Sequence, residues 1–261
     1  LDMRWRVLAV LGATALMMAG MAPATAQNGA QVVASGLNNP RGLAFSPNGG
    51  LYVAEAGAGG AGPCFAGPEG PACFGHSGSV TRIDGSGQRR VLTGLPSYGE
   101  EGTGNSAIGP SDVAFQGQGS MYVTEGLGLD LDFSKTIPAL SSMGKLLNKQ
   151  GAKLKVVADL AAFEDANNPA GDEENVNPNS VLSVGGARVV SDAGANDLLR
   201  VAANGRISVL ATFPNRLPRT RRPPRARTSI SGQAEGQGGP PRRLIVPYVV
   251  VAFATGAVAC E

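Results

Sequence analysis

The hexapeptide PRGLAF at residues 40–45 recurs as PSDVAF at 110–115 and, more loosely, as PNSVL at 178–182. Each copy precedes a short apolar run that ends in an acid: LYVAE at 51–55, MYVTE at 121–125 and RVVSD at 188–192. Repetition of this kind is typical of sheet units that stack or form a ring, because no single unit can bury its apolar face alone. The sequence therefore predicts at least three copies of one β-sheet module.

The segments that close the modules support the same interpretation. SVTRIDGSGQRRVL at 79–92 and DLLRVAANGRISVL at 197–210 each contain two short apolar runs joined by a Gly turn. The chain has 38 Gly and 18 Pro among 261 residues, and both are spread along it as turn signals. We expect one all-β domain of many short strands, with a single helix in the repeats that begins after the capping residue Asp159.

The N-terminus has the three parts of a secretory signal peptide, which we assign to residues 1–26. Arg4 and Arg6 form a basic start, residues 7–20 are almost wholly apolar, and Ala24 to Ala26 provide a small-residue cleavage site. Leu1 and Asp2 precede Met3 and are interpreted as an artefact of start-site assignment. An N-terminal membrane helix is the alternative, but the segment is short for a span. We expect the mature protein to be secreted or periplasmic, with no stable membrane span.

Export permits a disulfide, and Cys64 and Cys73 are the only two closely spaced cysteines. They flank a Gly- and Pro-rich insertion that a bridge would hold in place. Two free thiols or a metal site are the alternatives, and Cys260 would have no partner in the chain. His76, the single histidine, lies in the same insertion, where we expect a loop residue without a catalytic role.

Residues 186–205, GARVVSDAGANDLLRVAANG, resemble an NHL-type propeller repeat. Together with SGLNNPRGLAF at 35–45, the cysteine insertion and VADLAAFE at 157–164, they make the chain similar to the ScyD/ScyE family of secreted proteins, named after a scytonemin-pigment gene cluster. The likeness covers about residues 30–214. It implies an exported β-propeller of six-bladed NHL type and no established activity.

The propeller predicted for residues 27–214 is incomplete, with about three blades. Residues 215–261 are Pro/Gly-rich and contain eight Arg and two Glu, so we expect an out-of-frame or disordered tail produced by a frameshift or assembly error. There are two alternatives for this tail. It could be a basic arm that binds nucleic acid or an anionic surface, or it could contain a C-terminal membrane anchor that begins at Leu244. Without a closing partner, the first and last blades should expose apolar faces and self-associate.

Glu55, Glu125 and Asp192 occupy the same position in the three modules. In a ring of blades, equivalent carboxylates could surround a divalent cation such as Ca²⁺. Alternatively, each acid accepts hydrogen bonds from backbone N–H groups of its own blade. Asp130 and Asp132 lack the pattern of a calcium loop and are expected in a solvated loop.

For function, the sequence predicts a binding or scaffold propeller whose ligand, a small molecule or a protein, contacts loops at one end of the ring. The alternative is a metal-dependent hydrolase or lactonase-like enzyme that uses the three acids. Residues 27–214 have a net charge of −5. We therefore expect no nucleic-acid partner for the repeats.

Overall fold

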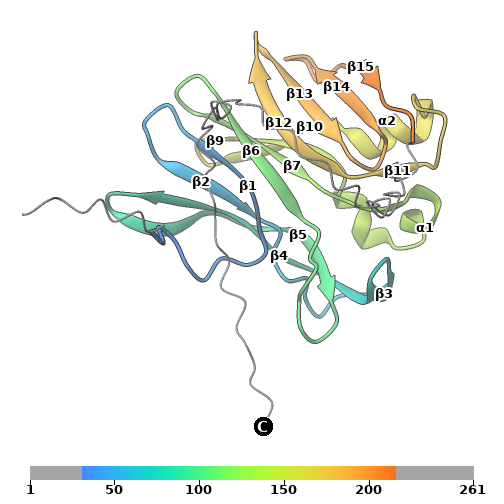
Figure 1. Ribbon diagram of the computed structural model, residues 1–261, viewed down its shortest axis with the longest axis horizontal. Coiled ribbons are helices and arrows are strands. Elements are labelled where there is room, and N and C mark those ends of the chain that lie inside the picture. Colours follow the sequence, from blue (N-terminus) through green and yellow to red (C-terminus); the bar gives the residue numbers. More distant parts are fainter. Residues whose placement is uncertain (1–30, 216–261) are drawn as a thin grey trace, which may run out of the picture. The chain divides into compact units, whose positions relative to one another are not determined.

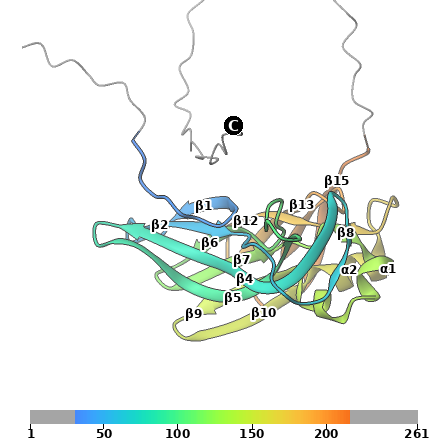
Figure 2. The same ribbon diagram turned by 90° about the horizontal axis from the view of Figure 1, so that it is seen from below.

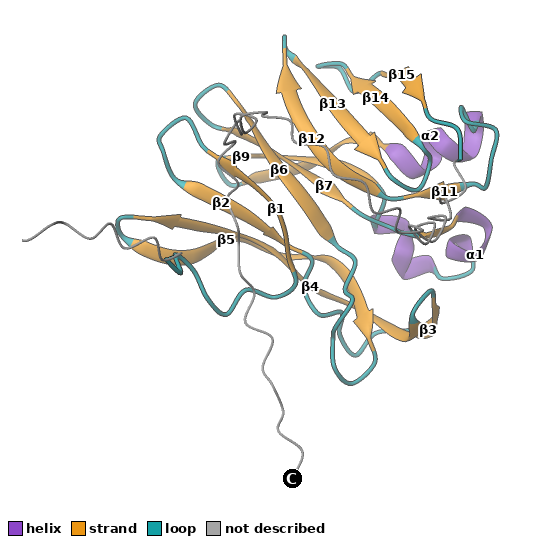
Figure 3. Ribbon diagram, viewed as in Figure 1, coloured by secondary structure: helices purple, strands orange, loops and turns teal. Residues whose placement is uncertain are grey.

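The computed structural model describes residues 31–215, which fold into one five-stranded and two four-stranded antiparallel sheets, together with a two-stranded sheet (Figure 1 and Figure 3). The proposed signal peptide and residues 216–261 of the tail lie outside the described residues. Among the residues that the structure describes, no helix is both long and apolar enough to cross a membrane.

Four strands of the first sheet form blade 1, in which a long insertion separates the second strand from the third. Its members are β1 (Pro40–Phe45), β2 (Leu51–Glu55), β4 (Gly70–Asp84) and β5 (Gly87–Glu100). Strand β3 (Cys64–Gly67) pairs with the beginning of β4. The first half of β4 and the second half of β5 therefore extend beyond the blade (Figure 2).

Blades 2 and 3 repeat this antiparallel order. Blade 2 consists of β6 (Pro110–Gln116), β7 (Ser120–Glu125), β9 (Lys145–Gln150) and β10 (Lys153–Asp159). Blade 3 consists of β12 (Pro178–Val184), β13 (Ala187–Asp192), β14 (Asp197–Val201) and β15 (Ile207–Thr212). Each blade is thus a meander in which every strand pairs with the next strand of the blade.

The blades pack beside one another through their first strands, so that β6 contacts both β1 and β12 (Figure 1). One apolar cluster, which includes Val80, Val113 and Val123, fills the space between blades 1 and 2. A second cluster includes Ala114 and Val190 and joins blade 2 to blade 3. Radial packing of four-stranded meanders is the architecture of a β-propeller. The predicted fold is confirmed: residues 31–215 form three propeller blades.

Strands β4 and β5 differ from the short strands that the sequence led us to expect, since they contain 15 and 14 residues. The predicted disulfide joins Cys64 to Cys73, which are paired across the β3–β4 hairpin. His76 lies in β4 rather than in a loop, so its predicted environment was wrong. The insertion is ordered because its Phe74 is buried in the same apolar cluster as Tyr98, and the two residues pair across β4 and β5.

Helices occupy the connections around blade 2. The predicted helix is α2 (Leu160–Asn167), and the carboxylate of Asp159 caps it by accepting a hydrogen bond from the N–H of Ala162. The loop expected around Asp130 is instead a short helix, α1 (Leu131–Lys135), because Asp130 caps its first turn in the same way. A 3-10 turn, η1 (Pro138–Ser142), follows it. Strand β8 (Leu129–Asp130) pairs with β11 (Asn175–Val176).

Candidate functional site

The three acids singled out in the sequence do occupy equivalent places. Each ends the second strand of its blade and lies opposite the proline that begins the first strand. The pairs are Pro40 with Glu55, Pro110 with Glu125 and Pro178 with Asp192. All three carboxylates are buried. Their hydrogen bonds, however, differ from one blade to the next.

Glu55 is fully satisfied by its neighbours. Its carboxylate accepts hydrogen bonds from the hydroxyls of Ser79 and Thr81 and from the backbone N–H of Asn38, and it forms an ion pair with Arg90 at 2.8 Å. Burial alone would raise the pKa of Glu55, but these donors outweigh it and lower the pKa below its usual value. Glu55 therefore stabilises blade 1 as an ionised group.

Glu125 has the opposite environment. It is 0% exposed, and neither of its oxygens has a hydrogen-bond partner among the described residues. Burial raises its pKa well above the usual value for a glutamate, because a charged carboxylate is costly in a low-dielectric interior. The neutral acid is therefore favoured at this position.

Asp192 shows the backbone-capping arrangement that the sequence suggested as an alternative. Its Oδ1 accepts hydrogen bonds from the N–H groups of Asn177, Gly194 and Ala195 at 2.7, 2.9 and 3.0 Å. Its Oδ2 has no partner in the described part of the chain. Burial raises the pKa of Asp192, and the three backbone donors offset part of that effect.

The oxygens of Glu55, Glu125 and Asp192 do not lie within 4.8 Å of one another. Within residues 31–215, Cys64, Cys73 and Glu101 form the one trio of candidate ligand residues that meets this distance. The two sulfur atoms of that trio are already joined in the disulfide. A ring of carboxylates around a cation stays a prediction, and Arg90 already neutralises its first member.

A second group of acids, which we call the acid cluster, consists of Glu164, Asp172, Asp192 and Asp197. Glu164, Asp192 and Asp197 are buried and Asp172 is half-buried. Burial, followed by the charges of the three aspartates, raises the pKa of Glu164 to about 7. Sequence reasoning missed Glu164, because a charged residue within a short helix is ordinarily expected on the solvated face. The available signal was its spacing from Leu160. The two residues are four positions apart and therefore share one helix face, and both are 1% exposed.

The first strands of the three blades surround an open hollow of about 430 Å³, which we call the central hollow. Its lining is largely apolar and includes Leu43, Phe45 and Leu182, which are 41%, 69% and 62% exposed. Asp112 is the single ionisable residue of the lining. Its Oδ2 accepts a hydrogen bond from the N–H of Val181 at 3.0 Å, which ties blade 2 to blade 3.

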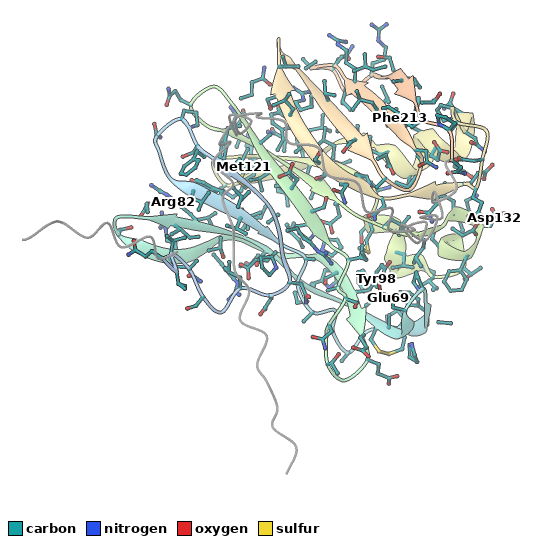
Figure 4. All side chains as sticks on the ribbon, viewed as in Figure 1. Glu69, Arg82, Tyr98, Met121, Asp132 and Phe213 are labelled. Carbon is teal, nitrogen blue, oxygen red and sulfur yellow. A yellow bond between two sulfur atoms is a disulfide. The ribbon has the colours of Figure 1, made fainter. Side chains whose placement is uncertain are left out.

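Tyr98, labelled in Figure 4, belongs to a separate aromatic group in the extension of blade 1. Tyr98 is 3% exposed, its hydroxyl donates to the carbonyl of Leu127 at 2.6 Å, and its ring packs edge-on against Phe65. Burial, followed by the charge of Glu69, raises the pKa of Tyr98. The hydroxyl therefore serves as a structural donor between blades 1 and 2.

No protein-family model matches the sequence, and no curated protein matches it. Among solved structures, a nidogen/laminin complex is similar over 69% of this chain, with 14% identity and a TM-score of 0.38. Virginiamycin B lyase from Staphylococcus aureus is similar over 67%, with 13% identity and a TM-score of 0.37. A luciferin-regenerating enzyme is also similar over 67%, with 13% identity and a TM-score of 0.40.

The matched region covers less than half of each of those proteins, namely 49%, 42% and 47% of their chains. Likenesses at this level carry no argument about activity. The assignment as a propeller rests on the three meanders and on the packing of β6 between β1 and β12.

Proposed function

We propose that this chain is an exported β-propeller of ScyD/ScyE type that acts as a binding or scaffold module. The observation that carries the proposal is the central hollow, where exposed apolar side chains of blades 1 and 3 and the half-buried Phe115 of blade 2 surround one carboxylate. Concave apolar surfaces with few polar groups are the usual form of ligand sites. The ligand class that fits is an apolar small molecule or an apolar protein segment.

Two observations support export. The Cys64–Cys73 bridge is of a kind that persists in oxidising compartments. The N-terminal segment has the composition of a signal peptide. Fusion of residues 1–30 to a reporter enzyme that is active only outside the cytoplasm tests this part: activity supports export, and a silent but expressed fusion contradicts it.

The binding proposal is tested with Nile red, a neutral dye whose fluorescence rises in apolar sites. We expect the full chain to bind the dye, and we expect Phe45→Ser to weaken binding several-fold because Phe45 lines the hollow. The matched control is Val156→Ser on β10, which removes an apolar side chain of similar exposure, 57%, away from the hollow. Equal losses in both variants would contradict a specific site.

The alternative function, a metal-dependent hydrolase, would require Glu55, Glu125 and Asp192 to bind a metal ion together. Glu55 is already paired with Arg90 and bonded to three other donors. The geometry therefore favours the binding module, and we do not extend the proposal to catalysis.

A further inference from the structure

Each blade has two faces, because successive residues of a strand point to opposite sides of its sheet. One face of blade 2 packs against blade 1, and we call it the leading face: Val113, Phe115, Met121 and Val123. The opposite face packs against blade 3, and we call it the trailing face: Ala114, Tyr122 and Leu146. The same names apply to the equivalent faces of blades 1 and 3.

Contacts between the blades follow this division. Tyr52 on the trailing face of blade 1 packs edge-on against Phe115 on the leading face of blade 2, with ring centroids 4.7 Å apart. Tyr122 has the same repeat position as Tyr52 and contacts blade 3, where Cζ of Arg188 lies 4.4 Å from the centroid of its ring. Both junctions between blades within residues 31–215 therefore join a trailing face to a leading face.

The leading face of blade 1 remains exposed on its inner strand. Leu43 and Phe45 on β1 are 41% and 69% exposed, whereas Val113, the equivalent of Leu43 in blade 2, is 2% exposed. The backbone of Ser35 exchanges two hydrogen bonds with the side chain of Gln88 on β5, at the outer strand of the blade. Strand β1 is thus an apolar surface of the kind that another blade covers in blade 2.

The trailing face of blade 3 is exposed in the same way. Leu182 pairs in register with Val189, as Ala114 pairs with Tyr122 on the trailing face of blade 2. Leu182 is 62% exposed, whereas its equivalent Ala114 is 7% exposed. Val184, two residues further along the same strand and face, is 53% exposed. Blade 3 therefore presents an apolar face that has the repeat position of a blade junction.

The two exposed faces are complementary in kind, since one is a leading face and the other is a trailing face. They lie at opposite ends of the array, because blade 2 packs between blades 1 and 3 through β6 (Figure 1). The two faces of one copy are thus kept apart, but the same pair of faces can join two copies. Propellers have about four to eight blades, and within that range units of three blades close a ring as two copies.

We propose that two copies of this chain associate into one six-bladed ring, with the trailing face of blade 3 packed on the leading face of blade 1 of the second copy at both junctions. Leu182 of each copy would then contact β1 of the other, where Leu43 and Phe45 are exposed. These junctions repeat the kind of contact already present between blades 1 and 2. The second copy would also supply the missing side of the central hollow, although the association itself does not depend on a ligand.

The experiment measures the mass of the full chain by sedimentation equilibrium without added ligand. The parent chain should have twice the mass of one copy, which is 26.4 kDa. Phe45→Asp places a charge on the leading face of blade 1, and Leu182→Asp places one on the trailing face of blade 3. Each variant alone should associate about a hundredfold or more weakly, because both junctions of its dimer would bury an unpaired aspartate.

An equimolar mixture of the two variants tests which faces meet. In a mixed pair, one junction contains both aspartates. The other junction joins the unaltered trailing face of the Phe45→Asp copy to the unaltered leading face of the Leu182→Asp copy. The mixture should therefore regain a dimer population that neither variant shows alone.

The matched control is Val156→Asp on β10 of blade 2, because Val156 is an apolar residue of similar exposure, 57%, outside the two faces. This variant should stay dimeric, and circular dichroism confirms that all variants fold. A monomeric parent chain would overturn the proposal, as would a parent that grows into open-ended oligomers with concentration. A dimer that persists in either single variant, or a mixture that stays monomeric, would also contradict it.

Discussion

Asp192, the last residue of β13, lies directly opposite Asp197, the first residue of β14, across the turn that joins the two strands. Two buried acids in one cross-strand pair repel each other, and like charges directly opposite are destabilising. Asp192 stabilises the turn in return, because its Oδ1 accepts hydrogen bonds from the N–H groups of Gly194 and Ala195.

Replacement of Asp192 by Ala should therefore destabilise the chain by about 2–4 kcal/mol, because one buried and two partly buried backbone donors lose their acceptor. Asp192→Asn keeps Oδ1 and removes the charge, so it should lose much less. Urea unfolding followed by circular dichroism measures both. If the Asn variant were as unstable as the Ala variant, the charge rather than the acceptor would be essential.

Gly42 on β1 lies tightly against Asp112 on β6. A Cβ at this position would lie 2.1 Å from Asp112 Oδ1 and 2.9 Å from Asp112 Cα, so the backbones of β1 and β6 would have to separate. Gly42→Ala should cost about 1–3 kcal/mol through overpacking. Gly119→Ala is the control, since a Cβ there meets no atom within 4 Å. Similar unfolding midpoints for the two variants would contradict this prediction.

The Glu55 network predicts a dependence of stability on pH. The folded-state pKa of Glu55 is lowered, so the stabilisation that it provides is fully present above the usual glutamate pKa and is lost as pH falls through the lower folded-state value. Glu55→Gln should thus be less stable than the parent near pH 7, and the gap should narrow toward pH 3. Tm measured from pH 3 to pH 7 tests this, and a constant gap would contradict it.

The disulfide should contribute to the stability of the blade 1 extension. Cys64 and Cys73 are nine positions apart, and closing a loop of this length in the unfolded chain is worth about 2–3 kcal/mol. Cys73→Ser should lower Tm under oxidising conditions and remove the effect of a reductant. Cys260→Ser, which changes a cysteine outside the described residues, is the control. Equal sensitivity of the Cys73→Ser variant and the parent to reductant would refute the assignment.

Exposed apolar residues on the first strands predict self-association. Phe45 on β1 corresponds in register to Phe115 on β6, and Phe115 packs against the cluster between blades 1 and 2. Phe45 itself is 69% exposed, and Leu182 on β12 is 62% exposed. Phe45→Ser with Leu182→Ser should reduce the oligomer fraction in gel filtration with light scattering. A parent chain that is already a monodisperse monomer would contradict this prediction.

The sequence alone determined the repeat and its sheet class. In each repeat a proline begins one strand and an acid ends the next. The structure places these two positions opposite each other, as it does Pro110 and Glu125. Turn signals, the Asp159 cap and the cysteine pair also predicted local structure correctly. These features depend on local backbone chemistry, which is written in short segments of the chain.

Tertiary structure decided which charged groups are neutralised and which are not. Glu55 and Glu125 occupy the same repeat position, yet Arg90 reaches only the first, and the second is buried without a partner. Glu164 is distant in sequence from Asp192 and Asp197, and only the fold brings it near enough for their charges to act on it. Burial and electrostatic pairing depend on contacts between residues distant in sequence, so a local pattern cannot specify them.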